Sequence, residues 1–185
     1  MTSSRRTQML DAAVDILAWQ GSRALTHRAI DRRLSLPLGS AANYFQTRDA
    51  LLRGIAERVI ELDFASFGPI PEERVGRAFV AESIAAMILQ WMEPPSLTRQ
   101  RARHELLLHS VRDADLRAEF QRVRKEFLIF AARALDAGGC LTPHEHAPAL
   151  VALYDGICLD QLYYADRAAG LDVLSDQVRQ LLDGC

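Results

Sequence analysis

The sequence is poor in cysteine and contains no apolar run of membrane-spanning length. Its three cysteines, Cys140, Cys158 and Cys185, are odd in number and match no metal or redox spacing, so we expect free thiols in a reducing compartment. No apolar stretch approaches the roughly 20 residues that a membrane helix needs. The first residues lead into an amphipathic stretch instead of a signal-peptide core. We therefore expect a cytoplasmic protein with no membrane partner.

Metal-binding and catalytic motifs are also missing. His104 and His109 are five residues apart, about 140° around a helix, whereas a zinc pair on one helix face needs a spacing of four. His144 and His146 point away from each other on a helix. No nucleophile–base pair or phosphate-binding loop is present. We therefore expect no metal, no cofactor and no enzymatic activity, with a helical enzyme as a remote alternative.

A convincing strand pattern is absent as well, because apolar residues recur at helical spacing along almost the whole chain. Glycine, proline and short polar turns divide the sequence into about nine segments of this kind. After the first three, the expected helices lie near 47–67, 72–92, 98–111, 114–137, 144–166 and 171–183. The pattern predicts an all-α fold.

The net charge is only −2 at pH 7, but its distribution is uneven. Residues 1–60 contain nine arginines and five acidic residues, a net charge of +4, whereas residues 61–185 carry a net charge of −6. A basic first third on an acidic remainder is typical of a nucleic-acid-binding head joined to a body with another task.

The pattern of apolar and turn residues in the first 46 positions predicts three helices in a helix-turn-helix arrangement. A first helix buries one apolar face and ends at Gly21, and Thr26 caps the start of the second. The break at residues 35–37 is too short to reverse the chain, so the third helix crosses the second steeply, with Pro37 in its first turn. We therefore expect a DNA-binding domain at 1–46 and a larger helical domain at 47–185.

The third helix has a small, polar outer surface. Gly39, Ser40 and Ala41 allow its backbone to come close to bases in a major groove. Asn43 can bond an adenine edge or a phosphate, and Leu38 can touch a thymine methyl group. Two short helices joined by a tight turn also occur in helical proteins that never bind DNA, so spacing alone leaves that alternative open.

Residues 10–60 resemble the N-terminal domain of the TetR/AcrR family of bacterial transcriptional regulators. The matching segments are LTHRAI at 25–30, LPLGS at 36–40, NYF at 43–45 and TRDALL at 47–52. The resemblance implies a homodimer whose two heads each read one half of a near-palindromic operator on double-stranded DNA. It also implies a C-terminal body that dimerises and binds a small molecule, which usually releases a repressor from DNA.

The family's DNA contacts carry over by position. Thr26, Tyr44 and Arg48 would meet phosphates, and Phe45 would be a core residue. Tyr44 is alternatively a second core aromatic. The predicted DNA-binding residues are Thr26, Arg28, Leu38, Gly39, Ser40, Asn43, Tyr44 and Arg48.

The sequence departs from the family pattern at three positions in the head. Ser35 replaces a common glycine, which implies a tighter or strained turn. Pro37 replaces the usual capping serine, so that side-chain cap is lost. Ala42 replaces a common aromatic residue and removes one contact to DNA.

The predicted domain at 47–185 contains apolar helix faces that favour an effector pocket and a dimer interface. The predicted pocket residues are Phe64, Phe67, Met87, Trp91, His104, Leu107, Leu108, Phe127 and Tyr154. The predicted dimer residues are Leu150, Gly156, Ile157, Leu174, Val178 and Leu181. Ordinary core packing within one chain is the alternative for both sets. We expect a repressor released by a small apolar or aromatic effector, or alternatively a constitutive DNA-binding regulator of the same fold without a ligand.

Overall fold

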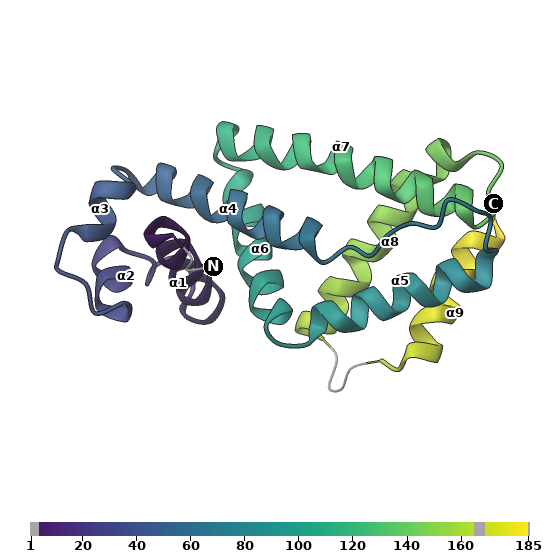
Figure 1. Ribbon diagram of the computed structural model, residues 1–185, viewed down its shortest axis with the longest axis horizontal. Coiled ribbons are helices and arrows are strands. Elements are labelled where there is room, and N and C mark those ends of the chain that lie inside the picture. The colour runs from purple at the N-terminus through teal and green to yellow at the C-terminus, as the bar shows by residue number, and fades with distance from the viewer. Residues whose placement is uncertain (1–3, 165–168, 185) are drawn as a thin grey trace. The chain divides into compact units, whose positions relative to one another are not determined.

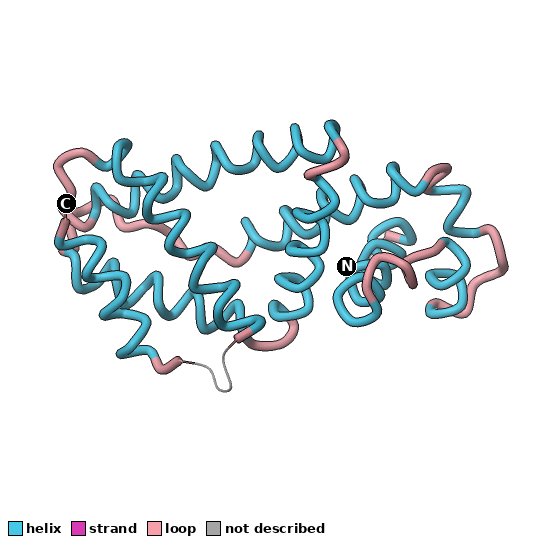
Figure 2. Tube along the Cα trace, turned by 180° about the vertical axis from the view of Figure 1, so that it is seen from behind, coloured by secondary structure: helices cyan, strands magenta, loops and turns pink. Residues whose placement is uncertain are grey.

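Helices joined by loops, without strands, make up the part that the computed structural model describes, residues 4–164 and 169–184 (Figure 1; Figure 2). This confirms the predicted all-α class. In the described ranges the helices are α1 (Arg5–Gln20), α2 (His27–Arg33), α3 (Ser40–Tyr44), α4 (Arg48–Ala65), α5 (Arg77–Met92), α6 (Ser96–Ser110), α7 (Ala114–Ala137), α8 (Pro143–Tyr163) and α9 (Leu171–Asp183). The predicted helix end at residue 166 and the predicted free thiol of Cys185 lie outside the described residues.

Most helix ends in the head follow from local sequence. The Thr26 hydroxyl accepts a hydrogen bond from the Ala29 amide at 3.1 Å, and the Thr47 hydroxyl accepts one from the Ala50 amide at 3.1 Å. α1 stops at Gly21, whose φ of +75° suits a residue without a Cβ atom. These caps confirm the predicted starts of α2 and α4 and the predicted end of α1.

The connection between α2 and α3 differs from the prediction. Pro37 lies outside α3, and its carbonyl oxygen accepts hydrogen bonds from the amide and the hydroxyl of Ser40. The prediction that Pro37 lies in the first helical turn is wrong, because Gly39 adopts a φ of +92° and interrupts the helical path before Ser40. Ser35 has a φ of +52°, which confirms the strained turn expected where the family has glycine.

The chain divides into two compact units. The first comprises Met1–Ser66 with Pro95–Phe120, and the second comprises Phe67–Pro94 with Gln121–Cys185. The first unit therefore holds α4 and α6 together with the three head helices. The sequence analysis divided the chain by function, into a DNA-binding domain at 1–46 and a second domain at 47–185, and that division stays a prediction.

None of the described helices combines the length and the apolar character needed to cross a bilayer.

The core of the first unit forms where α1 packs against α4 and α6. Its largest fully buried side chains are Met9, Ile16, Leu17, Leu25, Ile30, Leu51, Ile55, Leu106 and Leu116. Phe45 is also buried, as predicted. This apolar core holds the short α2 and α3 against a longer helical support.

A buried ion pair joins the last turn of α4 to α6. Asp63 has a side chain that is 1% exposed, and its Oδ1 accepts hydrogen bonds from Arg99 Nε at 2.5 Å and from Gln100 Nε2 at 3.3 Å. Arg103 Nε lies 4.0 Å from Oδ2. Burial raises the pKa of Asp63 above its ordinary value, although Arg103 and Arg99 oppose that shift. The carboxylate is thus the shared partner of two cationic side chains.

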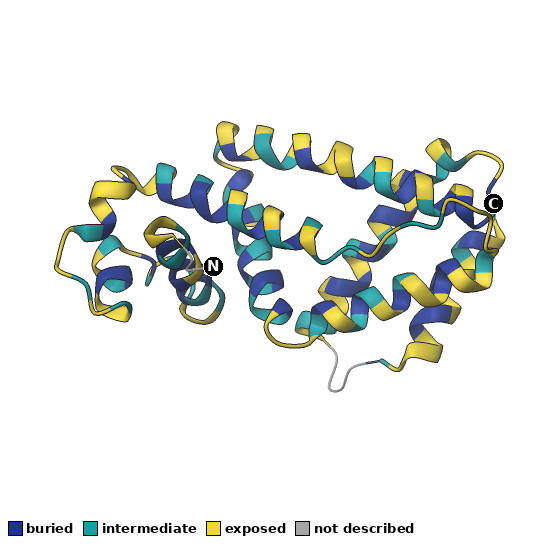
Figure 3. Cartoon of the chain, in the orientation of Figure 1, coloured by how far each residue is buried: buried dark blue, intermediate teal, exposed yellow. Residues whose placement is uncertain are grey.

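In the second unit, α9 packs mainly on α5 and also touches α8. Buried and exposed residues occupy different faces of α9 (Figure 3). α5 begins at Arg77 instead of near residue 72, because Gly76 with a φ of +83° ends an irregular approach to the helix. α7 and α9 have the predicted bounds.

Candidate nucleic-acid interface

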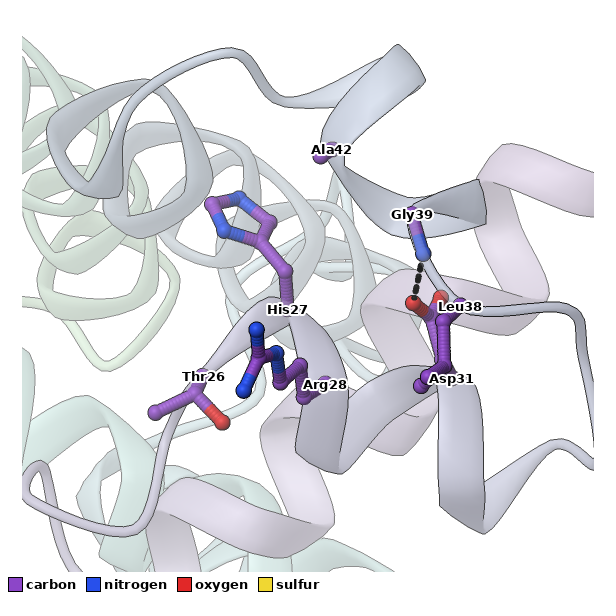
Figure 4. A pocket seen from close by; sticks show the side chains of 7 residues that line it. All are labelled: Thr26, His27, Arg28, Asp31, Leu38, Gly39 and Ala42. Carbon is purple, nitrogen blue, oxygen red and sulfur yellow. Dashed lines mark hydrogen bonds between the residues drawn. The ribbon is translucent and has the colours of Figure 1, made fainter.

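α2 and α3 are fastened together by the carboxylate of Asp31. This side chain is fully buried, and it accepts hydrogen bonds from the backbone amides of Gly39 and Ala41, each at 2.8 Å. The Gly39 bond is drawn in Figure 4. A negative charge at the start of a helix also complements the helix dipole. Asp31 therefore supplies from α2 the cap that Pro37 cannot provide.

Sequence reasoning did not identify Asp31. The available signal was an acidic residue inside a helix whose other charged residues are arginines. That signal shows that a carboxylate is unusual at this position, but not which amides it meets eight and ten residues further on.

Most of the predicted DNA-binding residues are on the surface. Leu38 is 73% exposed and Tyr44 is 50% exposed. Ser40 is half-buried. Ala41 is fully buried against the core, so it does not belong to the outer surface on which the sequence analysis placed it. The exposed members of the set are Thr26, Arg28, Leu38, Gly39, Asn43, Tyr44 and Arg48.

A hollow of about 480 Å³ lies between α2 and α3 on this surface (Figure 4). Its walls combine apolar, hydroxyl and cationic groups. Four of its lining residues belong to the predicted DNA-binding set. The lining residues are Thr26, His27, Arg28, Asp31, Leu38, Gly39 and Ala42.

The arginines of residues 1–60 differ in whether an acidic side chain pairs with them. Arg58 is bound to Asp11 at 2.8 Å, and that hydrogen bond is the main reason why its pKa is raised. Arg33 is likewise paired with Asp15 in the same unit. Arg28 and Arg32, by contrast, are exposed on α2 and form no ion pair with any residue that the structure describes. Their charge remains available to an anionic partner.

Arg48 has a structural contact that the family comparison did not predict. One guanidinium nitrogen donates to the Leu25 carbonyl at 2.8 Å, and the other donates to the Ser22 carbonyl at 2.7 Å. The side chain therefore ties the start of α4 to the segment before α2. A contact between Arg48 and phosphate stays a prediction.

An aromatic cluster gathers in the second unit. The Phe67 ring stacks on Trp91 and Phe130, with centroids 5.6 Å and 4.3 Å away, and meets Phe127 edge to face at 5.4 Å. Trp91 meets Tyr154 edge to face at 5.3 Å. The structure thus brings together four of the predicted pocket residues and adds Phe130, which the predicted lining omitted.

The remaining predicted pocket residues do not form one set. Met87 is half-buried in the second unit, whereas four others belong to the first unit: Phe64, His104, Leu107 and Leu108. Leu108 is 67% exposed, so its assignment to an enclosed pocket is wrong. The reason is that α6 buries the face of Ala102 and Leu106, and Leu108 lies about 200° around the helix from Leu106. The His104 Nδ1 atom lies 2.8 Å from the Gln100 carbonyl oxygen.

The predicted dimer residues are mostly covered within one chain. Leu174 and Val178 are fully buried, because α9 packs on α5, so they cannot offer apolar area to a partner. Leu150 and Ile157 on α8 are also buried, as expected if they pack within one chain and not against a partner. Leu181 is half-buried. Gly156 differs, because it is exposed and a Cβ atom added there would meet nothing within 4 Å.

A helix-turn-helix head with exposed cationic side chains, among described residues that form only helices and loops, is typical of DNA-binding transcriptional regulators. Residues 75–184 match the family model described as the Tetracyclin repressor-like, C-terminal domain. The chain therefore belongs to the TetR family, which consists of transcriptional regulators and not of enzymes. No curated protein sequence matches the chain.

Solved structures share this fold over nearly the full length. A member of the TetR family from Streptomyces coelicolor A3 is 26% identical, with 97% of this chain and 98% of that chain covered and a TM-score of 0.77. The multidrug binding protein EbrR, complexed with ethidium, is 25% identical, with coverage of 96% and 98% and a TM-score of 0.72. A transcriptional regulator from Saccharomonospora viridis, in complex with choline, is 15% identical, with coverage of 96% and 95% and a TM-score of 0.77.

Proposed function

We propose that this protein is a repressor that binds a near-palindromic operator as a homodimer and is released by a small aromatic effector. The observation that carries the proposal is the surface of α2 and α3. Asp31 fixes the start of α3, while Leu38 and Asn43 stay exposed beside it. An ordered helix start with exposed side chains of this kind is what direct reading of a major groove requires.

The proposed phosphate contacts flank this reading surface. Arg28 and Arg32 on α2 form no ion pair with the described residues, and the exposed Tyr44 lies at the end of α3. Contacts of arginine and tyrosine to phosphate fix the register of a protein on DNA without reading its sequence. Thr26, Gly39, Ser40 and Arg48 complete the proposed contact set.

The proposed homodimer keeps Gly156 from the sequence analysis but uses the exposed face of α8 around it in place of the buried Leu150 and Ile157. The residues of this face follow helical spacing and combine small and apolar side chains: Ala149, Ala152, Gly156, Leu159 and Tyr163. Small residues allow two helices to approach closely, and a twofold axis would place the same stripe of the second copy opposite. Two heads are needed because a single head covers too few bases for useful specificity.

A charged residue in this stripe is expected to separate the two copies. We predict that Gly156→Arg sediments as a monomer, whereas the unmodified protein sediments at twice the 20.7 kDa mass of one chain. The matched control is Leu141→Arg, which puts the same charge on an exposed site of the same unit, outside the stripe. A Gly156→Arg protein that sediments as a dimer would contradict the proposed dimer interface on α8.

The effector proposal rests on the aromatic cluster around Phe67. Aromatic faces bind flat apolar molecules and attract cations that lie over the ring. EbrR, which is 25% identical to this chain, was solved with ethidium, a flat aromatic cation. We infer that the effector of this protein is of the same chemical class and binds at the rings of Phe67, Trp91 and Tyr154.

Trp91 provides a direct test of effector binding in the absence of DNA. The protein has two tryptophans, and the other one, Trp19, is 55% exposed on α1. In a Trp19→Phe variant, ethidium is expected to quench the remaining fluorescence in a saturable way and to raise the melting temperature by mass action. The matched Trp91→Phe variant should lose the saturable quenching. If ethidium and other aromatic cations change neither signal, the constitutive alternative is favoured.

A further inference from the structure

A cysteine and a histidine meet where α7 turns into α8, in a loop that can be followed in Figure 1. The Sγ atom of Cys140 lies 3.2 Å from Nδ1 of His146, which is within hydrogen-bond distance for sulfur. The hydroxyl oxygen of Thr142 lies 3.4 Å from the same nitrogen. All three residues belong to the second unit, and neither the proposed DNA-binding surface nor the aromatic cluster uses them.

Backbone hydrogen bonds fix the positions of the thiol and the imidazole. The Cys140 amide donates to the Leu135 carbonyl at 3.0 Å, so the chain folds back onto the end of α7 after Gly139, whose φ is +86°. His146 lies in the first turn of α8, and its amide donates to the Thr142 carbonyl at 3.2 Å. The two side chains therefore meet because the ends of two helices hold them, and not through a chance contact of mobile surface groups.

The burial of the thiol limits what can react with it. Cys140 is 3% exposed and His146 is half-buried, whereas the intervening Leu141 is 81% exposed. Because an exposed residue directly follows Cys140, the sulfur lies close beneath the surface of the loop. A molecule of a few atoms can meet it there, and a bulky reagent cannot.

The pairing with an imidazole favours a reaction of a single thiol. A base within hydrogen-bond distance can take the thiol proton and leave a nucleophilic sulfur. Cys158 lies roughly 22 Å beyond the start of α8, at 1.5 Å for each residue, which is too far for a disulfide with Cys140. Hydrogen peroxide is a small oxidant, and its reaction with a thiol needs one proton removed from sulfur and one supplied to the departing oxygen. A single imidazole can do both.

We propose that Cys140 and His146 form a peroxide-reactive thiol site, at which hydrogen peroxide converts Cys140 to a sulfenic acid. His146 takes the thiol proton on Nδ1 while the sulfur attacks one peroxide oxygen, so that an S–O bond forms and the O–O bond breaks. The departing hydroxide takes that proton from His146 and leaves as water. The sulfur is oxidised by two electrons and the peroxide is reduced by two. This reaction requires neither the operator nor the proposed effector.

The first experiment traps the sulfenic acid in the folded, full-length protein. Hydrogen peroxide is added together with dimedone, which forms a stable adduct with sulfenic acids, and tandem mass spectrometry locates the adduct. We expect it on Cys140 and not on Cys158, which is 0% exposed. Unfolding in urea should abolish the difference, because it separates Cys140 from His146. Equal modification of the two cysteines in the folded protein, or no adduct on Cys140, would overturn the proposal.

A second experiment tests the role of the imidazole. His146→Gln keeps a polar side chain that cannot carry the proton, and it should slow adduct formation on Cys140 by about 100-fold, as for the loss of a positioned base. The matched control His144→Gln, at an exposed histidine two positions earlier on α8, should retain the full rate. Circular dichroism verifies the folding of both variants, and the comparison of Cys140 with Cys158 needs no variant. A merely structural hydrogen bond would lower the melting temperature of His146→Gln and leave its rate unchanged, and that result would overturn the proposal.

Discussion

Asp31→Ala is expected to abolish specific operator binding while leaving the protein largely helical. The substitution removes the acceptor of the Gly39 and Ala41 amides, and Ala41 is fully buried. Because the buried Ala41 amide is left unsatisfied, whereas the amide of the exposed Gly39 can bind water, we expect the free energy of unfolding to fall by about 1–3 kcal/mol. The larger consequence is functional, since α3 no longer has a fixed start. The measurements are operator affinity by fluorescence anisotropy and unfolding by urea.

Two further variants separate the role of Asp31 from a general loss of charge. Asp31→Asn retains one acceptor oxygen and should have intermediate affinity. Asp15→Ala removes another carboxylate of the head, one that is 41% exposed and paired only with Arg33 in the described contacts, and should bind almost normally. Operator binding by Asp31→Ala at the affinity of the unmodified protein would refute the proposed fastening of α3.

Asp63→Ala is expected to cause the largest loss of stability. Its carboxylate faces Arg99 and Arg103 in the interior of the first unit, and the substitution leaves both cationic groups without that counter-charge. Breaking a buried pair on one side lowers the free energy of unfolding by about 3–5 kcal/mol. The urea midpoint, measured by circular dichroism, should fall accordingly with no change of slope.

The matched control for Asp63 is an exposed ion pair in the same unit. Arg6 and Glu57 lie 3.1 Å apart, with side chains that are about half exposed. Glu57→Ala should therefore change the free energy of unfolding by less than about 1 kcal/mol. Equal losses for Asp63→Ala and Glu57→Ala would show that the interior pair is not the stabilising contact inferred for it.

The parts of the fold that depend on local sequence were predictable. Thr26 and Thr47 cap the helices that follow them, and Gly21 ends α1, because each of these effects acts within a few residues. Pro37 was misplaced for a related reason. Proline suits the first turn of a helix, but the positive φ of Gly39 decides where α3 begins, and a sequence does not display that angle.

Contacts between distant residues were not predictable from periodicity. The stripe of Leu174 and Val178 correctly indicates a buried face of α9, but the same stripe fits a partner chain and the chain's own α5 equally well. The cluster of Phe67, Trp91 and Tyr154 joins side chains from segments up to 87 positions apart in the printed sequence. A helical pattern fixes which face is apolar and leaves open what covers it.

The family resemblance added DNA contacts that periodicity cannot provide, and the structure refines one of them. Arg48 occupies a position that implies a phosphate contact, and its guanidinium also holds the carbonyls of Ser22 and Leu25. A substitution at Arg48 would therefore disturb both the head and any contact with DNA. Arg28, which has no ion pair with the described residues, is the cleaner probe of the DNA interface.

The salt dependence of operator binding tests the central claim most directly. The observed affinity should fall steeply with salt concentration, because cationic side chains displace counterions from DNA. Arg28→Ala should lower the slope of log Kobs against log salt by about one for each bound head, whereas Arg133→Ala, an exposed arginine on α7, should leave the slope unchanged. An unchanged slope for Arg28→Ala, or equal changes for both variants, would contradict the assignment of α2 and α3 as the DNA-binding surface.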